Sequence, residues 1–343
     1  MGQNTVLMTR RRFLAGLCTV AGLGCAASLG LAACSPEPPG GAGASGAGGP
    51  RPFWLCGPAL AETLPLLRLA SENRPGNDGR PYRFAPWHSP DQLRALVAGG
   101  QADAAVLSLT AAATLKNRGL PVRVIALSSP PLWIVSTDPQ LRGLADLEGQ
   151  ELCLPYGPGE FPDLLLGALA RRSGLRLSVR HTGGGLETAN LLLSGRARHA
   201  FLSEPAASLA VKRAGAGTGP ALAKRVNLHA AWAELFPESP VLAHGALALC
   251  GGPADGDTLR AAYARESDKV ASDPQHATKL AATLFPELAR QAQNGVVPGS
   301  DIRLSLGPKA ATGARFLLAR LQEQSPQALG GRLPDAAFLE LGA

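Results

Sequence analysis

The sequence GQADAAVLSLTAAATLKNR occupies residues 100–118 and aligns without gaps to GRARHAFLSEPAASLAVKR at residues 195–213. Each copy passes from a glycine turn into a short apolar run, then a serine (Ser108 or Ser203) and an alanine-rich segment. An apolar run bounded by turn residues predicts a buried strand, and the alanine-rich segment predicts a helix. A leucine-bearing helix is predicted before each copy. The repeat therefore predicts two lobes of equivalent construction.

The residues around the first copy continue this alternation of strand and helix. Strands are predicted at residues 53–56, 82–84, 104–107 and 122–127. Helices are predicted at residues 59–70, 90–98 and 108–118. Ser89 and Pro90 are suited to the start of the second helix, as N-cap and first helical residue. Because alternating strands and helices form a largely parallel, doubly wound sheet, the fold class is α/β.

The N-terminus has the pattern of an export signal. Arg10, Arg11 and Arg12 precede an uncharged run at residues 13–33, and the arginines before Phe-Leu resemble a twin-arginine signal. The run ends in Leu-Ala-Ala before Cys34, which resembles a bacterial lipobox and predicts a signal peptide at residues 1–33 and lipidation of Cys34. An uncleaved membrane anchor is the alternative. Residues 34–50 contain no large apolar side chain and are predicted to form a flexible tether.

The composition is that of a globular protein. Of the 343 residues, 45% are hydrophobic and 17% are charged, which argues against a disordered chain. The net charge is +7, but three arginines belong to the predicted signal and the other basic residues are scattered. Nucleic acid is therefore not an expected partner.

Three cysteines remain in the body after the signal and the lipobox: Cys56, Cys153 and Cys250. Their wide spacing lacks the paired pattern of a zinc site, and no metal or cofactor is expected. We expect three buried apolar thiols, with one disulfide and a free thiol as the alternative. No HExxH, GxSxG or CxxCH sequence occurs, which argues against a metallohydrolase, a serine hydrolase and a haem carrier.

Three stretches, two of which overlap the repeat, resemble extracytoplasmic solute-binding proteins of ABC importers, in the group that serves nitrate, sulfonates, taurine and thiamine precursors. They are SPDQLRALVAGGQADAAV at residues 89–106, LADLEGQELCLP at residues 144–155 and FLSEPAASLA at residues 201–210. The resemblance extends over residues 53–321. Two positions depart from the family pattern: Arg198, where Asp is usual, and Glu160, where Ser or Thr is common.

The resemblance implies a two-lobed, periplasmic-binding-protein-like fold of type II, with a doubly wound sheet in each lobe. Lobe 1 would comprise residues 51–136 and 246–343, and lobe 2 residues 137–245. Two crossovers, near residues 136–139 and 244–247, would form the hinge. The implied protein is a monomer without enzymatic activity that sits on the periplasmic side or cell surface and delivers a small solute to a permease and ATPase complex. A lipid-tethered sensor and an exported enzyme on the same fold remain alternatives.

Candidate ligand-binding residues follow from the rule that open α/β sheets bind ligands beyond the carboxyl ends of their strands. They are Gly57, Trp87, His88, Ser108, Tyr156, Gly157, Glu160, Phe161, Ser203 and Glu204, with Cys56 beside them.

Several of these candidates also have ordinary structural roles. The two serines can cap helices, Trp87 can pack in the core, and His88 can be a surface residue. Gly157 can belong to a turn, and Glu204 can stabilise the start of its own helix.

Two of the candidates are acidic, and this bears on the solute. A helix N-terminus supplies donors for an anion such as nitrate or a sulfonate, but Glu160 and Glu204 beside it would oppose one. An uncharged or amine-bearing ring, stacked on Trp87 or Tyr156, is the better fit, and an N-heterocycle of the thiamine-precursor type is an example.

Overall fold

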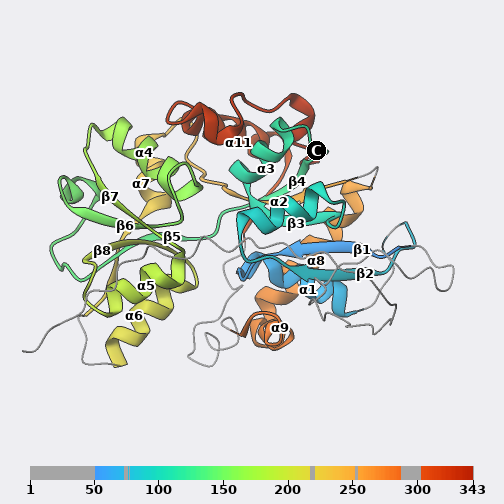
Figure 1. Cartoon of the computed structure of the whole chain (residues 1–343), viewed down its shortest axis with the longest axis horizontal. Helices are drawn as coiled ribbons and strands as arrows, with labels where there is room; N and C mark the ends of the chain where they lie inside the picture. The colour runs from blue at the N-terminus through green and yellow to red at the C-terminus, as the bar shows by residue number, and fades with distance from the viewer. Residues whose placement is uncertain are drawn as a thin grey trace, which may run out of the picture. The chain divides into compact units, whose positions relative to one another are not determined.

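The computed structural model describes residues 51–72, 76, 78–216, 221–251, 254–286 and 303–342. The predicted signal, the lipobox cysteine and the tether lie outside these residues. Within them, every helix is too short or too polar to cross a membrane. The described residues belong to one compact unit and are shown in colour in Figure 1.

Two separate sheets organise this unit. The first sheet has six strands: β1 (Phe53–Gly57), β2 (Tyr82–Pro86), β3 (Ala104–Ser108), β4 (Arg123–Ser128), β10 (Gly245–Leu249) and β11 (Leu304–Ser305). The second has five strands: β5 (Leu132–Ser136), β6 (Glu151–Pro155), β7 (Ser178–Thr182), β8 (His199–Ser203) and β9 (Ala223–Asn227). We call the first sheet and its helices lobe 1 and the second sheet and its helices lobe 2.

The two sheets have the same strand order. Lobe 1 runs β2-β1-β3-β10-β4-β11 and lobe 2 runs β7-β6-β8-β5-β9, with the fourth strand antiparallel to the third in both. The strands of the two repeated stretches, β3 and β8, therefore occupy the same third place. The predicted α/β fold with two lobes of equivalent construction is confirmed.

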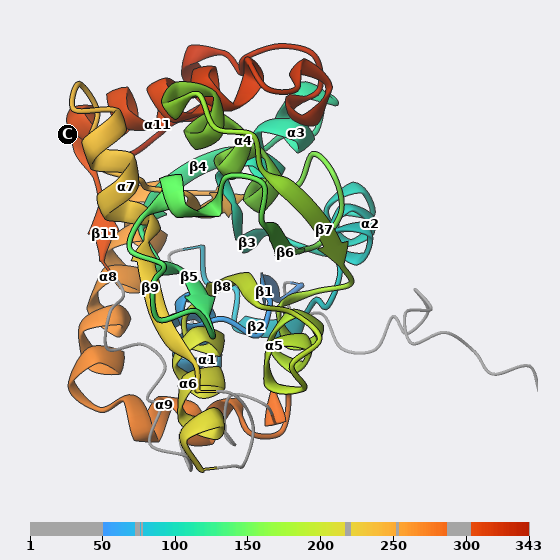
Figure 2. The same cartoon turned by 90° about the vertical axis from the view of Figure 1, so that its left-hand side faces the viewer.

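Helices cover both faces of each sheet (Figures 1 and 2). In lobe 1 they are α1 (Leu64–Ser71), α2 (Pro90–Ala98), α3 (Leu109–Asn117), α8 (Gly256–Ser272) and α9 (Pro274–Ala281). In lobe 2 they are α4 (Phe161–Ser173), α5 (Gly185–Leu193), α6 (Ala206–Ala216) and α7 (Leu228–Leu235). The side chains of successive strand residues alternate between the two faces, as Cys56 and Leu55 do, so each lobe has two apolar layers.

One helix near the C-terminus contacts both lobes. This helix, α11 (Gly307–Gln322), packs on α3 of lobe 1 and on α4 of lobe 2. Phe316 makes edge-on contacts with the rings of Trp232 and Phe236, which belong to lobe 2. The sequence predicts that the C-terminal segment belongs to lobe 1. In the structure it belongs to neither lobe alone, because its apolar face is buried against both lobes.

The chain first crosses between sheets earlier than predicted. The family resemblance predicts the first crossover near residues 136–139, but β5 (Leu132–Ser136) pairs with β8 and β9 and so lies in lobe 2. The crossover is residues 129–131, where Pro130 and Pro131 end the strand because proline has no N–H to donate. The return crossover, residues 240–244, leads into β10 close to the predicted position.

The two crossovers are hydrogen-bonded to each other. The carbonyl oxygen of Pro130 accepts from Nε2 of His244 at 3.1 Å and from Nε2 of His229, in α7, at 2.8 Å. The ring of His244 stacks on Phe161, the first residue of α4, with ring centroids 4.5 Å apart. The hinge is thus joined to lobe 2 by polar and aromatic contacts.

The three body cysteines are buried and unbonded, as expected. Burial, with a smaller contribution from Asp103, raises the pKa of Cys56 to about 12. Burial also raises the pKa of Cys153 and Cys250, so all three thiols stay protonated at neutral pH.

The hinge histidines predict an acid-sensitive fold. Burial and the neighbouring His229 lower the pKa of His244 from 6.5 to about 3, so the folded protein favours the uncharged ring. The contribution of His244 to the free energy of unfolding should be constant above about pH 6.5 and fall toward pH 3 by at most about 1.4 kcal/mol per pH unit. Denaturant unfolding measured from about pH 6.5 to pH 3 tests this dependence on pH. His244→Phe should make the free energy of unfolding depend less steeply on pH, whereas His276→Gln, at an exposed position, should not. An unchanged dependence in His244→Phe would exclude His244 as the cause.

Candidate functional site

The carboxyl ends of the central strands of both lobes lie beside the crossovers. Ser108, at the end of β3, pairs with Gly245, which follows His244 directly. Ser203, at the end of β8, pairs with Leu132, which follows Pro131 directly. The structure therefore brings the equivalent strand ends of the two lobes to the hinge, where the sequence rule places a ligand.

The candidates of lobe 1 are largely engaged in local structure. Ser108 accepts a hydrogen bond from the N–H of Ala111 at 3.1 Å and so caps α3. The indole N–H of Trp87 donates to the carbonyl of Val106 at 3.2 Å, and the half-buried ring packs on the core. His88 is exposed and lies edge-on to Phe285, with ring centroids 6.2 Å apart.

Gly57 has a packing reason to be glycine. A Cβ at this position would lie only 2.5 Å from the hydroxyl oxygen of Thr63, a fully buried residue. The end of β1 is therefore closely covered by the chain that follows it, and any larger residue would displace that cover.

The loop after β6 contains most of the candidates of lobe 2. Tyr156 has φ of 70°, in the left-handed region that costs a residue with a side chain about 1–2 kcal/mol. The loop continues through Gly157 to Glu160, which precedes α4 but makes no side-chain capping bond. Phe161 is buried and stacks on His244, so it is a hinge contact.

Tyr156 is partly exposed at the protein surface. Its residue is 45% exposed, yet burial, followed by the charge of Glu160, raises the pKa of its phenol. Strained backbone is often found at binding sites, and Tyr156 remains a predicted ligand-binding residue.

Glu204 is paired within lobe 2. Its carboxylate accepts from the N–H of Ser208 at 3.2 Å, in the first turn of α6, and forms an ion pair with Lys224 of β9. Lys224 also donates to the hydroxyl of Ser208 at 2.6 Å and lies 5.2 Å from the centre of the Trp133 ring. The charge of Glu204 is thus compensated, and the expectation that it would oppose an anion is not supported.

Sequence reasoning missed two residues that hold the Tyr156 loop. Nδ1 of His181, in β7, lies 3.0 Å from the carbonyl oxygen of Tyr156. Asp163, in the first turn of α4, accepts from the N–H of Gly159 at 2.8 Å. The rule that ligands bind beyond the carboxyl ends of strands would have indicated His181, since it is the penultimate residue of its strand.

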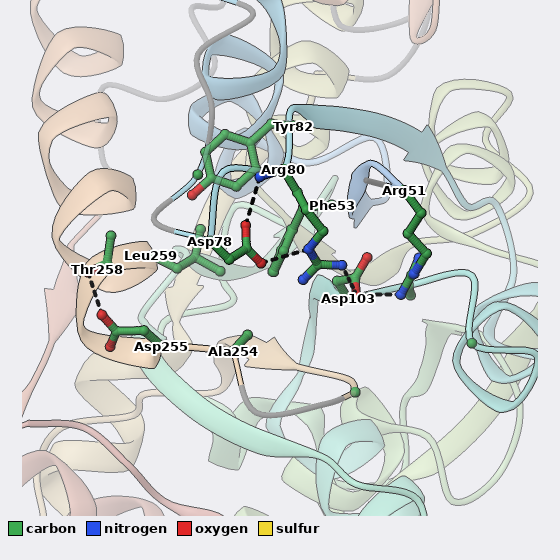
Figure 3. Close-up of a pocket in the computed structure, with 14 residues that line it drawn as sticks. Arg51, Phe53, Asp78, Arg80, Tyr82, Asp103, Ala254, Asp255, Thr258 and Leu259 are labelled. Carbon is green, nitrogen blue, oxygen red and sulfur yellow. Dashed lines mark hydrogen bonds and ion pairs between the residues drawn. The ribbon is translucent and has the colours of Figure 1, made fainter. Parts of the chain in front are cut away.

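A cavity of about 540 Å³ lies at the end of the lobe 1 sheet away from the hinge, where β1 and β2 begin (Figure 3). Arg80 donates to Asp78 at 2.7 Å and to Asp103 at 3.2 Å, and Arg51 donates to Asp103 at 2.7 Å. Asp103 also accepts from the N–H of Trp54 at 2.8 Å. These charges compensate one another and fix the start of β1, so this cavity is not the predicted ligand site.

Among the residues that the structure describes, no three His, Cys, Asp or Glu side chains are grouped as metal ligands would be.

No protein-family model matches this chain, and no curated protein matches it. Solved structures do. An ABC transporter structure from Parabacteroides distasonis is 19% identical over 84% of this chain and 99% of its own, with a TM-score of 0.66. The chain has the fold of ABC-transporter solute-binding proteins.

Two further structures share this fold. The periplasmic aliphatic sulphonate binding protein SsuA from Escherichia coli is 12% identical over 84% of this chain and 91% of its own, with a TM-score of 0.61. The ligand binding component of an ABC-type import system from Staphylococcus aureus, with zinc bound, is 16% identical over 85% of this chain and 97% of its own, with a TM-score of 0.58.

The Glu204–Lys224 pair predicts a measurable coupling. Lys224→Met leaves a carboxylate that is only 15% exposed without its cation and should lower the free energy of unfolding by about 1–3 kcal/mol. Adding Glu204→Gln should recover most of this loss, since no charge is then left unpaired. Denaturant unfolding of the two single variants and the double variant measures the coupling. Strictly additive effects would show that the pair is not energetically significant.

Proposed function

We propose that this chain is the solute-binding component of an ABC importer, anchored by a lipid on Cys34 to the periplasmic side of a membrane. It captures a small molecule between its lobes as a monomer and delivers it to a permease and ATPase complex. The observation that carries the proposal is the meeting of equivalent strand ends from the two lobes at a two-stranded hinge. The shared fold with import-system binding proteins supports it.

Capture would work through the hinge. Rotation at residues 129–131 and 240–244 closes one lobe on the other, as in other hinged binding proteins. The solute stabilises the closed form only to the extent that it binds that form more tightly. The closed form is then the one that docks on the permease.

The solute that we propose is a neutral or cationic ring. Glu160 occupies the N-cap position of α4, where a sulfonate or nitrate would otherwise bind the free N–H groups of the helix. Since Lys224 compensates Glu204, Glu160 is the acid whose charge remains for the solute. The partly exposed ring of Tyr156, close enough to be affected by this charge, offers a stacking surface.

Lipidation of Cys34 is tested by metabolic labelling with a fatty-acid analogue. The full-length protein should carry the label, and Cys34→Ser should lose it while remaining folded, because the thiol of Cys34 is the proposed acceptor. Cys25→Ser, within the signal, serves as the matched control and should keep the label. Undiminished label in Cys34→Ser would contradict the anchor.

The charge preference is tested by calorimetry with thiamine, taurine, MOPS and nitrate. Thiamine, a cationic heterocycle, should bind more tightly than taurine, MOPS and nitrate, which present a sulfonate or a nitrate group. Glu160→Ser should weaken thiamine binding by about 10-fold or more, the equivalent of one hydrogen bond to a charged group, and improve taurine binding. Glu234→Ser, on the exposed side of α7, should change neither. Tight binding of taurine or MOPS by the unaltered protein would refute the proposed solute class.

A further inference from the structure

The backbone of Tyr156 adopts a conformation that a tyrosine does not favour by itself. Among the described residues it is the non-glycine residue with positive φ, at 70°. A residue in this region must be held there by its surroundings. The contacts that hold Tyr156 therefore also determine where its ring points.

His181 makes the main polar contact with this residue. A carbonyl can only accept, so Nδ1 of His181 carries the proton that it shares with the Tyr156 oxygen at 3.0 Å. The His181 side chain is 26% exposed, at the end of the edge strand β7. It is thus not part of a large apolar core, and its contact with the loop is its most specific interaction.

Asp163 lies beside the other nitrogen of the imidazole. Its Oδ1 lies 3.5 Å from Nε2 of His181, and its Oδ2 accepts the N–H of Gly159 at 2.8 Å. One carboxylate in the first turn of α4 is therefore joined to both ends of the loop, to Gly159 directly and to Tyr156 through the ring of His181.

The ring of Tyr156 is bounded on its other side by the next turn. A Cβ at Gly184 would lie 3.7 Å from the Tyr156 ring, and Tyr156 forms an isolated bridge with Thr182. The carboxylate of Glu187 accepts the N–H of Gly183 at 2.7 Å and fixes this turn. The ring therefore has one side against the glycine turn and is otherwise held through its backbone.

We propose that His181, oriented by Asp163, is a positioning residue that sets the direction of the Tyr156 ring for the solute. The importance of this direction for binding rests on the proposed function, whereas the positioning itself can be tested without any ligand. Removal of the imidazole frees the Tyr156 carbonyl, and the loop relaxes toward ordinary backbone conformations.

Fluorine NMR of protein labelled with 3-fluorotyrosine reads the position of the ring directly. The chain has three tyrosines, and Tyr82 and Tyr263 are buried, so they serve as internal controls. Tyr156→Phe identifies the resonance of Tyr156. The variants are His181→Ala, which removes both contacts, and His181→Asn, whose amide nitrogen takes the place of Nδ1. Arg180→Ala, on the same strand, removes an ion pair with Glu151 and is the matched control.

His181→Ala should shift or broaden the Tyr156 resonance and leave those of Tyr82 and Tyr263 in place. His181→Asn should restore most of the original shift, and Arg180→Ala should have no effect. Asp163→Ala should move the same resonance, with no further change when combined with His181→Ala. An unmoved Tyr156 resonance in His181→Ala, or no rescue by Asn, would overturn the positioning role.

A second readout separates this proposal from the proposed function. With thiamine as the probe, His181→Ala should weaken binding about 10-fold and His181→Asn much less. If the resonance moves but thiamine does not bind the unaltered protein, the positioning role holds and the solute class is wrong. If the resonance moves and thiamine affinity is equal in all variants, Tyr156 does not contact the solute and the proposed role of His181 in binding is overturned.

Discussion

The carbonyl oxygen of Pro130 joins the two passages of the chain between its sheets. It accepts hydrogen bonds from His229 and His244, one in lobe 2 and one in the return crossover. Because a proline carbonyl has two lone pairs and its residue has no N–H, this position is suited to receiving two donors while taking part in no strand ladder. Both crossovers thus meet at this oxygen atom, and a central strand of each sheet begins or ends next to it.

This meeting point determines what lies nearby. The strand ends with Ser108 and Ser203 are held next to the crossovers by their pairing with Gly245 and Leu132. Phe161 couples the Tyr156 loop to the hinge by stacking on His244. The hinge and the start of α4 are thus in aromatic contact. We infer that solute contact and lobe movement are linked through this loop.

The sequence allowed the fold to be predicted but only part of the site. The repeated stretches identified β3 and β8 as equivalent strands, because burial of a strand on both faces leaves a short apolar run between turn residues. The first crossover was misplaced by several residues, although Pro130 and Pro131 signalled it. Apolar composition alone cannot show which sheet β5 joins, since strands of both sheets have the same pattern.

The partners of single side chains were the least predictable. Lys224 in β9 compensates Glu204, which follows β8, and no local spacing connects two residues that are brought together because both strands pair with β5. The left-handed conformation of Tyr156 was also unexpected, because propensity places glycine or asparagine there. His181 is a different case, since the rule about strand ends applies to it as it does to the chosen candidates.

The central claim is that the two lobes close on a small solute at the hinge. Native mass spectrometry of the protein purified from its source identifies any bound solute, and small-angle scattering with and without that solute measures closure. The account predicts a stoichiometric small molecule, neutral or cationic, whose removal increases the radius of gyration and whose return reverses the change. A bound solute that leaves the radius unchanged, or one that the purified protein converts chemically, would contradict the account.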